Sequence, residues 1–276
     1  MPNSVVTAKK LSGLDYIPRW LGGVACYITF GLGGLVCSLT ILPLIYLLSG
    51  SKAKQVARVQ KTVSLMFKFF VAMLTFTGVI KVKQQNLASL VNSQHTIIIA
   101  NHPTLVDVVV LISLMPNVSC VVKQGLWRNP LIRSILSGAG YIPNRGADLL
   151  LQDCQQVLDS GTNLIIFPEG TRTITGRIIN PFARGAANIA IRTNTSILPI
   201  VLRTDVAGLT KQQSWYEIPR QTINMSVEVG KLFSCEDYNE LADSESKKAR
   251  QLTRELEQFY IQQLVTPVIQ TTNKKN

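Results

Sequence analysis

Two short segments of this sequence carry side chains that could do chemistry together. The first is NHPTLVD at residues 101–107, which contains His102 and Asp107. A histidine titrates near neutral pH and can take a proton from a hydroxyl group. An aspartate about one helical turn later can accept a hydrogen bond from the other ring nitrogen, which fixes the tautomer and stabilises the imidazolium. The pattern predicts that His102 acts as a general base and Asp107 orients it.

This pair supplies two of the three groups of a serine hydrolase triad, and the serine is missing. No Gly-x-Ser-x-Gly motif occurs in the sequence. We therefore expect the nucleophile to be a hydroxyl of the substrate, in a direct transfer without an acyl-enzyme. The chain has only two histidines, His95 and His102, which excludes a site with three imidazole ligands, so we expect no metal. His95 lies in a polar context and is expected at the surface.

The second segment is FPEGTR at residues 167–172, which again follows a predicted strand. Gly170, Thr171 and Arg172 offer free backbone N–H groups, a hydroxyl and a guanidinium fork, a set suited to a phosphate or a carboxylate. The alternative is that Glu169 and Arg172 form an ordinary surface ion pair. The fully apolar strand that ends in Pro-Glu-Gly favours a binding site.

The elements that must position these segments belong to an α/β domain, because short apolar runs alternate with helical segments from about residue 81 onwards. Strands are expected at residues 96–100, 119–122, 163–167, 197–202 and 222–229, the last as an alternating edge strand. Helices are expected at residues 104–115, 149–159, 184–192 and 246–264. Leu252, Leu256 and Phe259 form a packing stripe on the last helix. Both chemical segments follow strands directly, where α/β folds expose reactive side chains.

The N-terminal third is apolar. No charged residue lies between Arg19 and Lys52, and residues 20–48 exceed the roughly 20 residues needed to cross a bilayer. Several glycines and Pro43 interrupt this run, so a bent or re-entrant helix fits as well as a straight span. A second apolar segment at residues 63–80 contains Lys68 and is typical of an interfacial or tilted helix.

The charges around these segments bear on topology. The positive-inside rule places the basic linker between them in the cytoplasm (Lys52, Lys54, Arg58, Lys61), but it makes the same demand for the N-terminus (Lys9, Lys10, Arg19). Both ends cannot be cytoplasmic if the first segment crosses once. We therefore favour a helical hairpin immersed from the cytoplasmic side over a true span. Two buried core helices are a third possibility. The predicted domains are an anchor at residues 1–80 and a catalytic domain at residues 81–276.

Composition agrees with a membrane-bound protein. The chain carries a formal charge of +12 and is 46% hydrophobic, which predicts contact with an anionic bilayer surface and not with nucleic acid. The five cysteines are odd in number and scattered, so they form neither a disulfide framework nor a CxxC metal site. A reducing location that faces the cytoplasm fits best.

Four blocks in order give the sequence a family resemblance: NHPTLVD; KQGLWRNPLIRSILSGAGYIPNR; FPEGTR with the segment ending in PFARGA; and ILPIVLR. Together they resemble the glycerolipid acyltransferase family, which contains bacterial 1-acyl-glycerol-3-phosphate acyltransferase. The resemblance implies a single α/β domain with a central mixed sheet flanked by helices, plus an N-terminal membrane-embedded helical hairpin. It implies that His102 and Asp107 form the catalytic dyad. It also implies that the acceptor phosphate is held by Lys123, Arg145, Glu169, Gly170, Thr171 and Arg172.

The activity implied by the resemblance is transfer of a fatty-acyl group to the hydroxyl of lysophosphatidic acid, giving phosphatidic acid. The donor would be acyl-CoA or an acyl carrier protein, with no other cofactor, and the site would face the cytoplasmic side of the inner membrane. The sequence departs from the family pattern at Asn144, Thr173 and Ala183, where the family commonly has Asp, Ser and Lys.

These departures leave the dyad intact and leave the acceptor open. Another lysophospholipid, a glycolipid or a specialised lipid tail is therefore the alternative substrate. A non-catalytic lipid-binding protein is a second alternative, but it would not need the base that His102 supplies.

Overall fold

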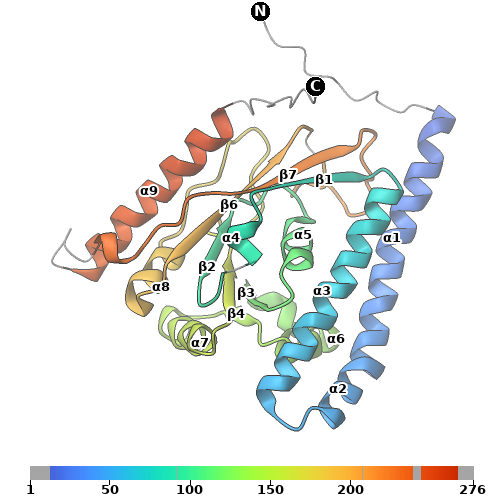
Figure 1. Ribbon diagram of the computed structural model, residues 1–276. Coiled ribbons are helices and arrows are strands. Elements are labelled where there is room, and N and C mark those ends of the chain that lie inside the picture. Colours follow the sequence, from blue (N-terminus) through green and yellow to red (C-terminus); the bar gives the residue numbers. More distant parts are fainter. Residues whose placement is uncertain (1–12, 92, 207, 239–243, 267–276) are drawn as a thin grey trace, which may run out of the picture.

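The computed structural model describes residues 13–91, 93–206, 208–238 and 244–266. Lys9, Lys10 and the polar tail TTNKKN lie outside these ranges. The described residues form a seven-stranded sheet with helices on both faces (Figure 1). The strands are β1 (Ile80–Gln85), β2 (Ile97–Ala100), β3 (Val118–Lys123), β4 (Ile142–Asn144), β5 (Asn163–Ile166), β6 (Ile197–Thr204) and β7 (Ile223–Val229). Their order is β1-β7-β6-β2-β5-β3-β4, and every neighbouring pair is parallel except β6 with β7. The sheet is therefore mixed, as expected.

Some α-helices precede the first strand, and the others lie between strands or after the last one. They are α1 (Ile17–Val36), α2 (Leu42–Leu48), α3 (Lys52–Phe76), α4 (Ala88–Val91), α5 (Asp107–Leu114), α6 (Pro130–Gly138), α7 (Ala147–Asp159), α8 (Gly185–Thr193) and α9 (Glu245–Val265). Short 3-10 turns occupy Gly13–Tyr16, Gln124–Arg128 and Glu236–Tyr238, and a π-helical turn occupies Cys37–Ile41.

Alternation along β2 divides the apolar interior between the two faces of the sheet, because successive side chains of a strand point to opposite sides. Ile98 and Ala100 join the apolar cluster that includes α3 and α5. Ile97 and Ile99 join the cluster that includes α7, α8 and α9. The result is a three-layer α/β/α arrangement with β2 and β5 in its middle, which places the ends of these two strands at the centre of the molecule.

The expected strands and helices are all present, with ends shifted by up to three residues. One assignment is wrong: residues 222–229 do not form an edge strand. Ile80 of β1 pairs with Ile223 of β7, so β1 covers that side and is itself the edge. Strands β1 and β4 and helix α6 were not anticipated. Strand β4 is short and contains Pro143, which suits the opposite edge because proline has no N–H to donate to a further strand.

The first apolar segment is helical almost throughout. Proline lacks the N–H that would bond the carbonyl four residues earlier, so Pro43 disturbs the regular pattern. Just before it, Leu42 N–H bonds the carbonyl of Cys37, five residues back, and the chain passes through a π turn from α1 into α2. The interruption expected at Pro43 is therefore a local change of pitch.

The predicted basic linker is also helical. Ser51 caps α3 by accepting from Lys54 N–H, and Lys52, Lys54, Arg58 and Lys61 all lie within that helix. Lysine, arginine, glutamine and alanine are good helix formers, and only residues 49–51 separate α2 from α3. The separate linker inferred from charge alone is therefore wrong.

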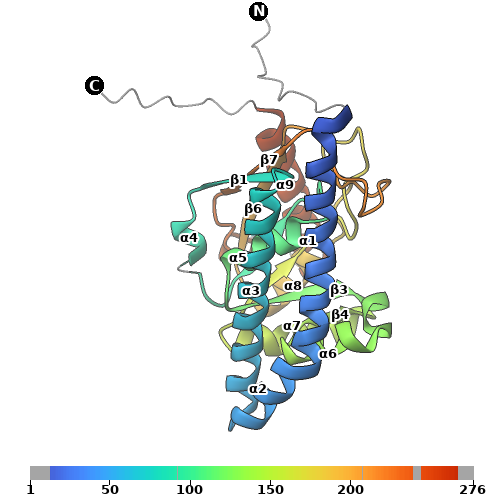
Figure 2. The same cartoon turned by 90° about the vertical axis from the view of Figure 1, so that its right-hand side faces the viewer.

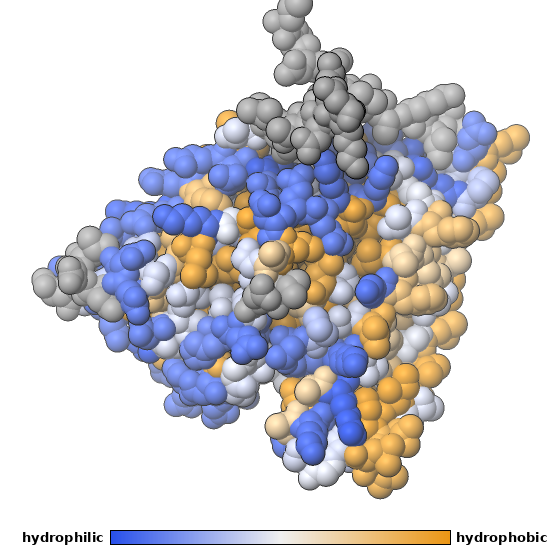
Figure 3. Space-filling view, in the orientation of Figure 1, coloured by the Kyte–Doolittle hydropathy of each residue, from blue (hydrophilic) through white to orange (hydrophobic). Residues whose placement is uncertain are grey.

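Helices α1 and α3 form a hairpin that lies along the side of the domain (Figures 1 and 2). Helix α3 packs on α5, whereas α1 exposes an apolar stripe that includes Leu21, Ile28 and Leu32. Apolar side chains follow this edge of the molecule from end to end (Figure 3). By length and composition, Gly13–Leu48 and Lys52–Phe76 could each cross a membrane. The exposure of α1 argues against two buried core helices.

Candidate active site

The two chemical segments meet at the carboxyl edge of the sheet. Residues 101–107 follow β2 and residues 167–172 follow β5, and these two strands are parallel neighbours. The carboxyl ends of neighbouring parallel strands lie at the same edge, so the two segments leave the sheet side by side. Direct bonds join them: Glu169 accepts from His102 N–H at 2.8 Å, and Thr173 N–H donates to the His102 carbonyl at 2.7 Å.

The histidine and aspartate predicted to act together are in contact. His102 Nδ1 lies 2.8 Å from Asp107 Oδ2, with Asp107 fully buried and the His102 side chain 18% exposed. The Asp107 carboxylate also accepts from Thr104 N–H at 2.7 Å and from the Thr104 hydroxyl. These bonds fix the carboxylate, which in turn selects the tautomer with hydrogen on Nδ1. Within the described residues, no hydrogen bond engages His102 Nε2, so this nitrogen is available as a base.

Asn101 and Phe167 fix the position of the histidine. The Asn101 amide bonds both the N–H and the carbonyl of Leu202 on β6, each at 2.8 Å, which ties the start of the loop to the adjacent strand. The His102 ring packs on the Phe167 ring with centroids 4.5 Å apart. The imidazole is thus held from two sides, which leaves its Nε2 edge to face outward.

Glu169 has a different set of contacts from the one expected. It was grouped with the phosphate-binding residues, but its side chain is buried and its two oxygens accept from His102 N–H, Asn180 N–H and the Thr173 hydroxyl. Burial raises the pKa of the Glu169 carboxyl, and the hydrogen bonds and the nearby His102 oppose this effect only in part. In this arrangement Glu169 fixes the backbone of the histidine loop.

The turn that follows Glu169 presents a cation beside the dyad. Gly170 N–H donates to the Phe167 carbonyl, and Gly170 has a φ of +65°, a conformation that favours glycine. Arg172 donates from Nη1 to the carbonyls of Leu209 at 3.2 Å and Thr210 at 2.8 Å. The other N–H groups of Arg172 and the side chain of Thr171 have no hydrogen-bond partner among the described residues, so they can bind an anion.

Lys123 and Arg145 lie at the same edge but further along it. Lys123 is exposed at the end of β3, and Arg145 follows β4, three strands from β2. Arg145 forms an ion pair with Asp153 of α7 at 2.9 Å. Arg172 thus bonds the segment after β6, whereas Arg145 bonds a helix next to β4. That Lys123, Arg145 and Arg172 hold one phosphate together stays a prediction.

Thr104 and Asn180 were not identified from the sequence as residues of the site, and Thr173 was noted only as a departure from the family pattern. All three are buried. Thr104 bonds Asp107 within the histidine loop, Asn180 bonds Glu169 and Arg172 within the second loop, and Thr173 bonds Glu169 and also joins the two loops through the His102 carbonyl. The sequence did mark Thr104, because Thr-x-x-Asp at the start of a helix is a capping-box pattern. His95 is exposed, as expected, although its Nδ1 lies 2.7 Å from the Leu158 carbonyl.

Comparisons with known proteins agree with this fold and these motifs. Residues 78–203 match the family model described as Acyltransferase. A 1-acyl-sn-glycerol-3-phosphate acyltransferase of Helicobacter pylori is 35% identical over 112 residues, which cover 38% of this chain and 47% of that protein. A chloroplastic 1-acyl-sn-glycerol-3-phosphate acyltransferase of Brassica napus is 32% identical over 109 residues, 38% of this chain and 31% of that one. The matched parts thus span less than half of these curated relatives.

A solved structure resembles nearly the whole chain. The crystal structure of the 1-acyl-sn-glycerophosphate (LPA) acyltransferase of Thermotoga maritima superposes with a TM-score of 0.68 at 16% identity, covering 90% of this chain and 99% of that one. At this identity the likeness establishes the fold, including the helices that precede the sheet.

Proposed function

We propose that this chain is a glycerolipid acyltransferase that transfers a fatty-acyl group from a thioester to the hydroxyl of lysophosphatidic acid, giving phosphatidic acid. The match of residues 78–203 to the Acyltransferase family model and the similarity to the Helicobacter pylori protein support this proposal. The observation that carries the proposal is the contact of His102 Nδ1 with the fully buried Asp107, which leaves Nε2 free at the rim of the sheet. The relatives named for this reaction support the choice of acceptor.

The chemistry follows from the geometry of the dyad. His102 Nε2 takes the proton of the acceptor hydroxyl as its oxygen attacks the thioester carbonyl carbon, and Asp107 stabilises the imidazolium that forms. The carbon–sulfur bond then breaks, and the imidazolium returns the proton to the departing thiolate. No side chain of the protein is acylated, and the thioester itself, on CoA or on an acyl carrier protein, is the only co-substrate required.

Arg172 is the residue best placed to hold the phosphate of the acceptor. It stands on the turn that Glu169 and Thr173 bind to the histidine loop, so its guanidinium has a fixed position relative to the dyad. A guanidinium with free N–H groups binds a phosphate through charge-assisted hydrogen bonds. Lys123 and Arg145 would add a basic field further along the rim.

The apolar stripe of α1 would bring this site to the bilayer. Because the hairpin lies along the domain and not above it (Figure 1), we propose that α1 lies within one leaflet, on the cytoplasmic side. If α1 lies parallel to the membrane surface, the catalytic domain stays in water. If α1 crossed the bilayer, the side of the domain next to it would be carried into the hydrocarbon layer. Lipid acceptors would then reach His102 without leaving the membrane.

The test is acyl transfer by the purified protein in phospholipid vesicles. Products from a panel of lysophospholipid acceptors, each offered with acyl-CoA and with acyl carrier protein, are read by mass spectrometry. We expect phosphatidic acid from lysophosphatidic acid, with His102→Ala as the inactive control. Undiminished turnover by His102→Ala would remove the mechanism.

The altered residues Asn144 and Ala183 favour a second candidate, the same transfer to a different lyso-lipid or glycolipid. Complementation decides between the two. A bacterial strain that lacks its own lysophosphatidate acyltransferase should grow when this chain is expressed, and failure to grow at good expression would favour the other acceptor.

A further inference from the structure

The segment between β6 and β7, residues 208–222, connects the active-site arginine to the anchor helix. At its beginning, Arg172 donates to the carbonyls of Leu209 and Thr210. Leu105 N–H, from the histidine loop, also donates to the Leu209 carbonyl at 2.9 Å. The start of this β6–β7 segment is therefore bonded to both loops of the site.

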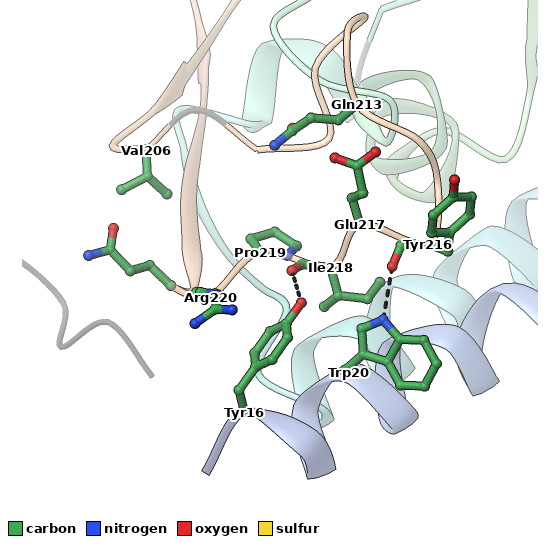
Figure 4. Close-up of a pocket in the computed structure, with 10 residues that line it drawn as sticks. Tyr16, Trp20, Val206, Gln213, Tyr216, Glu217, Ile218, Pro219 and Arg220 are labelled. Carbon is green, nitrogen blue, oxygen red and sulfur yellow. Dashed lines mark hydrogen bonds between the residues drawn. The ribbon is translucent and has the colours of Figure 1, made fainter. Parts of the chain in front are cut away.

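The rest of the β6–β7 segment lies against the first turns of α1. Trp20 donates from its indole nitrogen to the Tyr216 carbonyl at 3.1 Å, and the Tyr16 hydroxyl donates to the Ile218 carbonyl (Figure 4). Ile218 also packs on buried Gly23, where an added Cβ would lie 2.7 Å from the Ile218 side chain. The glycine thus permits the close approach, and the segment is held to the helix by both bonds and packing.

The outer surface of this junction is aromatic. Trp20, Trp215 and Tyr216 are 38%, 48% and 51% exposed. The Trp215 and Tyr27 rings make an edge contact with their centroids 5.8 Å apart, so Trp215 lies against α1. Tryptophan and tyrosine combine an apolar body with a polar tip and prefer the headgroup layer of a bilayer.

A cationic side chain, that of Arg220, lies close to these aromatic rings. The Arg220 guanidinium lies 5.0 Å from the centroid of the Tyr16 ring, beside a pocket of about 570 Å³ that the segment and α1 enclose (Figure 4). An arginine among interfacial aromatics suits the phosphate level of a membrane, and the charge of +12 favours an anionic surface. The aromatic surface of this segment is continuous with the exposed apolar stripe of α1, and this continuity favours a bilayer over a protein as the partner.

We propose that residues 208–222 enter the headgroup layer together with α1, and that this contact with the bilayer holds Arg172 in place beside the dyad. The first half of the proposal concerns only the membrane. The second half rests on the proposed function, because it gives Arg172 the acceptor phosphate to hold. Docking on the membrane would then complete the acceptor site.

Spin labelling tests the membrane contact directly. A nitroxide introduced by Tyr216→Cys has little competition from the native cysteines, since all five are buried. The matched control is Leu149→Cys, since Leu149 is 51% exposed and belongs to α7, a helix that lies away from α1 (Figure 1). When anionic vesicles are added, collisions of the label at 216 with a water-soluble nickel chelate should fall at least about threefold, because the headgroup layer excludes the chelate. The label at 149 should not change.

Equal access of the chelate to both labels on vesicles would overturn the proposal. This measurement does not depend on acyl transfer, so its failure is distinct from failure of the proposed function. A background label on the unsubstituted protein, measured in parallel, corrects for any reaction of the buried thiols.

Kinetic measurements test whether the membrane contact of residues 208–222 supports acceptor binding at the site that contains Arg172. Trp215→Ser should raise the KM for an acceptor presented in vesicles by about tenfold, since an interfacial anchor is lost. It should leave the KM for a short-chain acceptor, dissolved as monomers, unchanged. Leu149→Ser is the control and should alter neither. If Trp215→Ser raised both values equally, the ring would have a structural role alone and the proposal would fail.

Discussion

Replacement of Asp107 by asparagine separates the charge of the dyad from its shape. An asparagine oxygen can take the place of Oδ2 and accept from Thr104 N–H and His102 Nδ1, while its amide nitrogen donates to the Thr104 hydroxyl. The fold should therefore survive, with a loss of about 1 kcal/mol for the changed hydrogen bonds. The negative charge that stabilises the imidazolium is gone, so kcat should fall by about 10²- to 10³-fold.

Asp107→Ala has a different signature. Alanine leaves the Thr104 N–H and hydroxyl without an acceptor in a buried site, at about 1–3 kcal/mol for each. The alanine variant should therefore be less stable than the asparagine variant by about 1–5 kcal/mol, while both are nearly inactive.

The assay is denaturant unfolding in detergent for stability and initial rates of acyl transfer for kcat. His95→Gln is the control, because His95 is the other histidine and lies exposed away from the dyad; it should keep near-normal kcat. Loss of the negative charge should lower kcat by far more than about tenfold. A folded Asp107→Asn protein with more than a third of the wild-type kcat would therefore refute the role of the aspartate.

Further predictions concern the neighbouring turn. Glu169→Gln exchanges one acceptor oxygen for a donor that faces buried N–H groups, and should cost about 1–3 kcal/mol in urea unfolding at pH 7. Burial raises the pKa of Glu169, so the folded wild type binds more protons and gains stability as pH falls toward that pKa; the glutamine variant should lack this gain between pH 7 and pH 5, and parallel curves would contradict it. Arg172→Lys should raise the KM for an anionic acceptor by about tenfold, whereas Arg145→Lys, already paired with Asp153, should change it less than about threefold. Gly170→Ala should cost about 1 kcal/mol in the same unfolding assay, because φ is +65° while the space around the new Cβ is open.

The dyad was predictable because it is local. His102 and Asp107 are separated by a single turn, and a buried strand before them with a helix after them sets their geometry. Apolar runs such as residues 163–167 reveal the central strands for the same reason. The mixed sheet and the acyltransferase family were accessible from four ordered blocks.

What could not be predicted depends on contacts between distant parts of the chain. Glu169 bonds His102, 67 residues away, and Arg172 bonds the carbonyls of Leu209 and Thr210, 37 and 38 residues away. In the sequence, a Glu beside an Arg suggests an ion pair or an anion site, and only the fold reveals that the carboxylate is turned inward. The misplaced edge strand has the same origin, since β7 is covered by β1, which lies more than a hundred residues earlier.

The junction of α3 with β1 determines how the N-terminal hairpin is attached to the rest of the domain. Only residues 77–79 separate the end of α3 from β1, which pairs directly with β7, and one apolar cluster runs from α1 and α3 through α5 into the sheet. The hairpin is thus packed into the domain and is not joined to it by a flexible linker. Deleting it to obtain a soluble fragment would strip the hydrophobic cover from one face of the sheet and yield aggregates. If α1 lies within one leaflet, as proposed, this rigid connection means that the depth of α1 in the bilayer would set the height of the His102 imidazole above the lipid ester bonds.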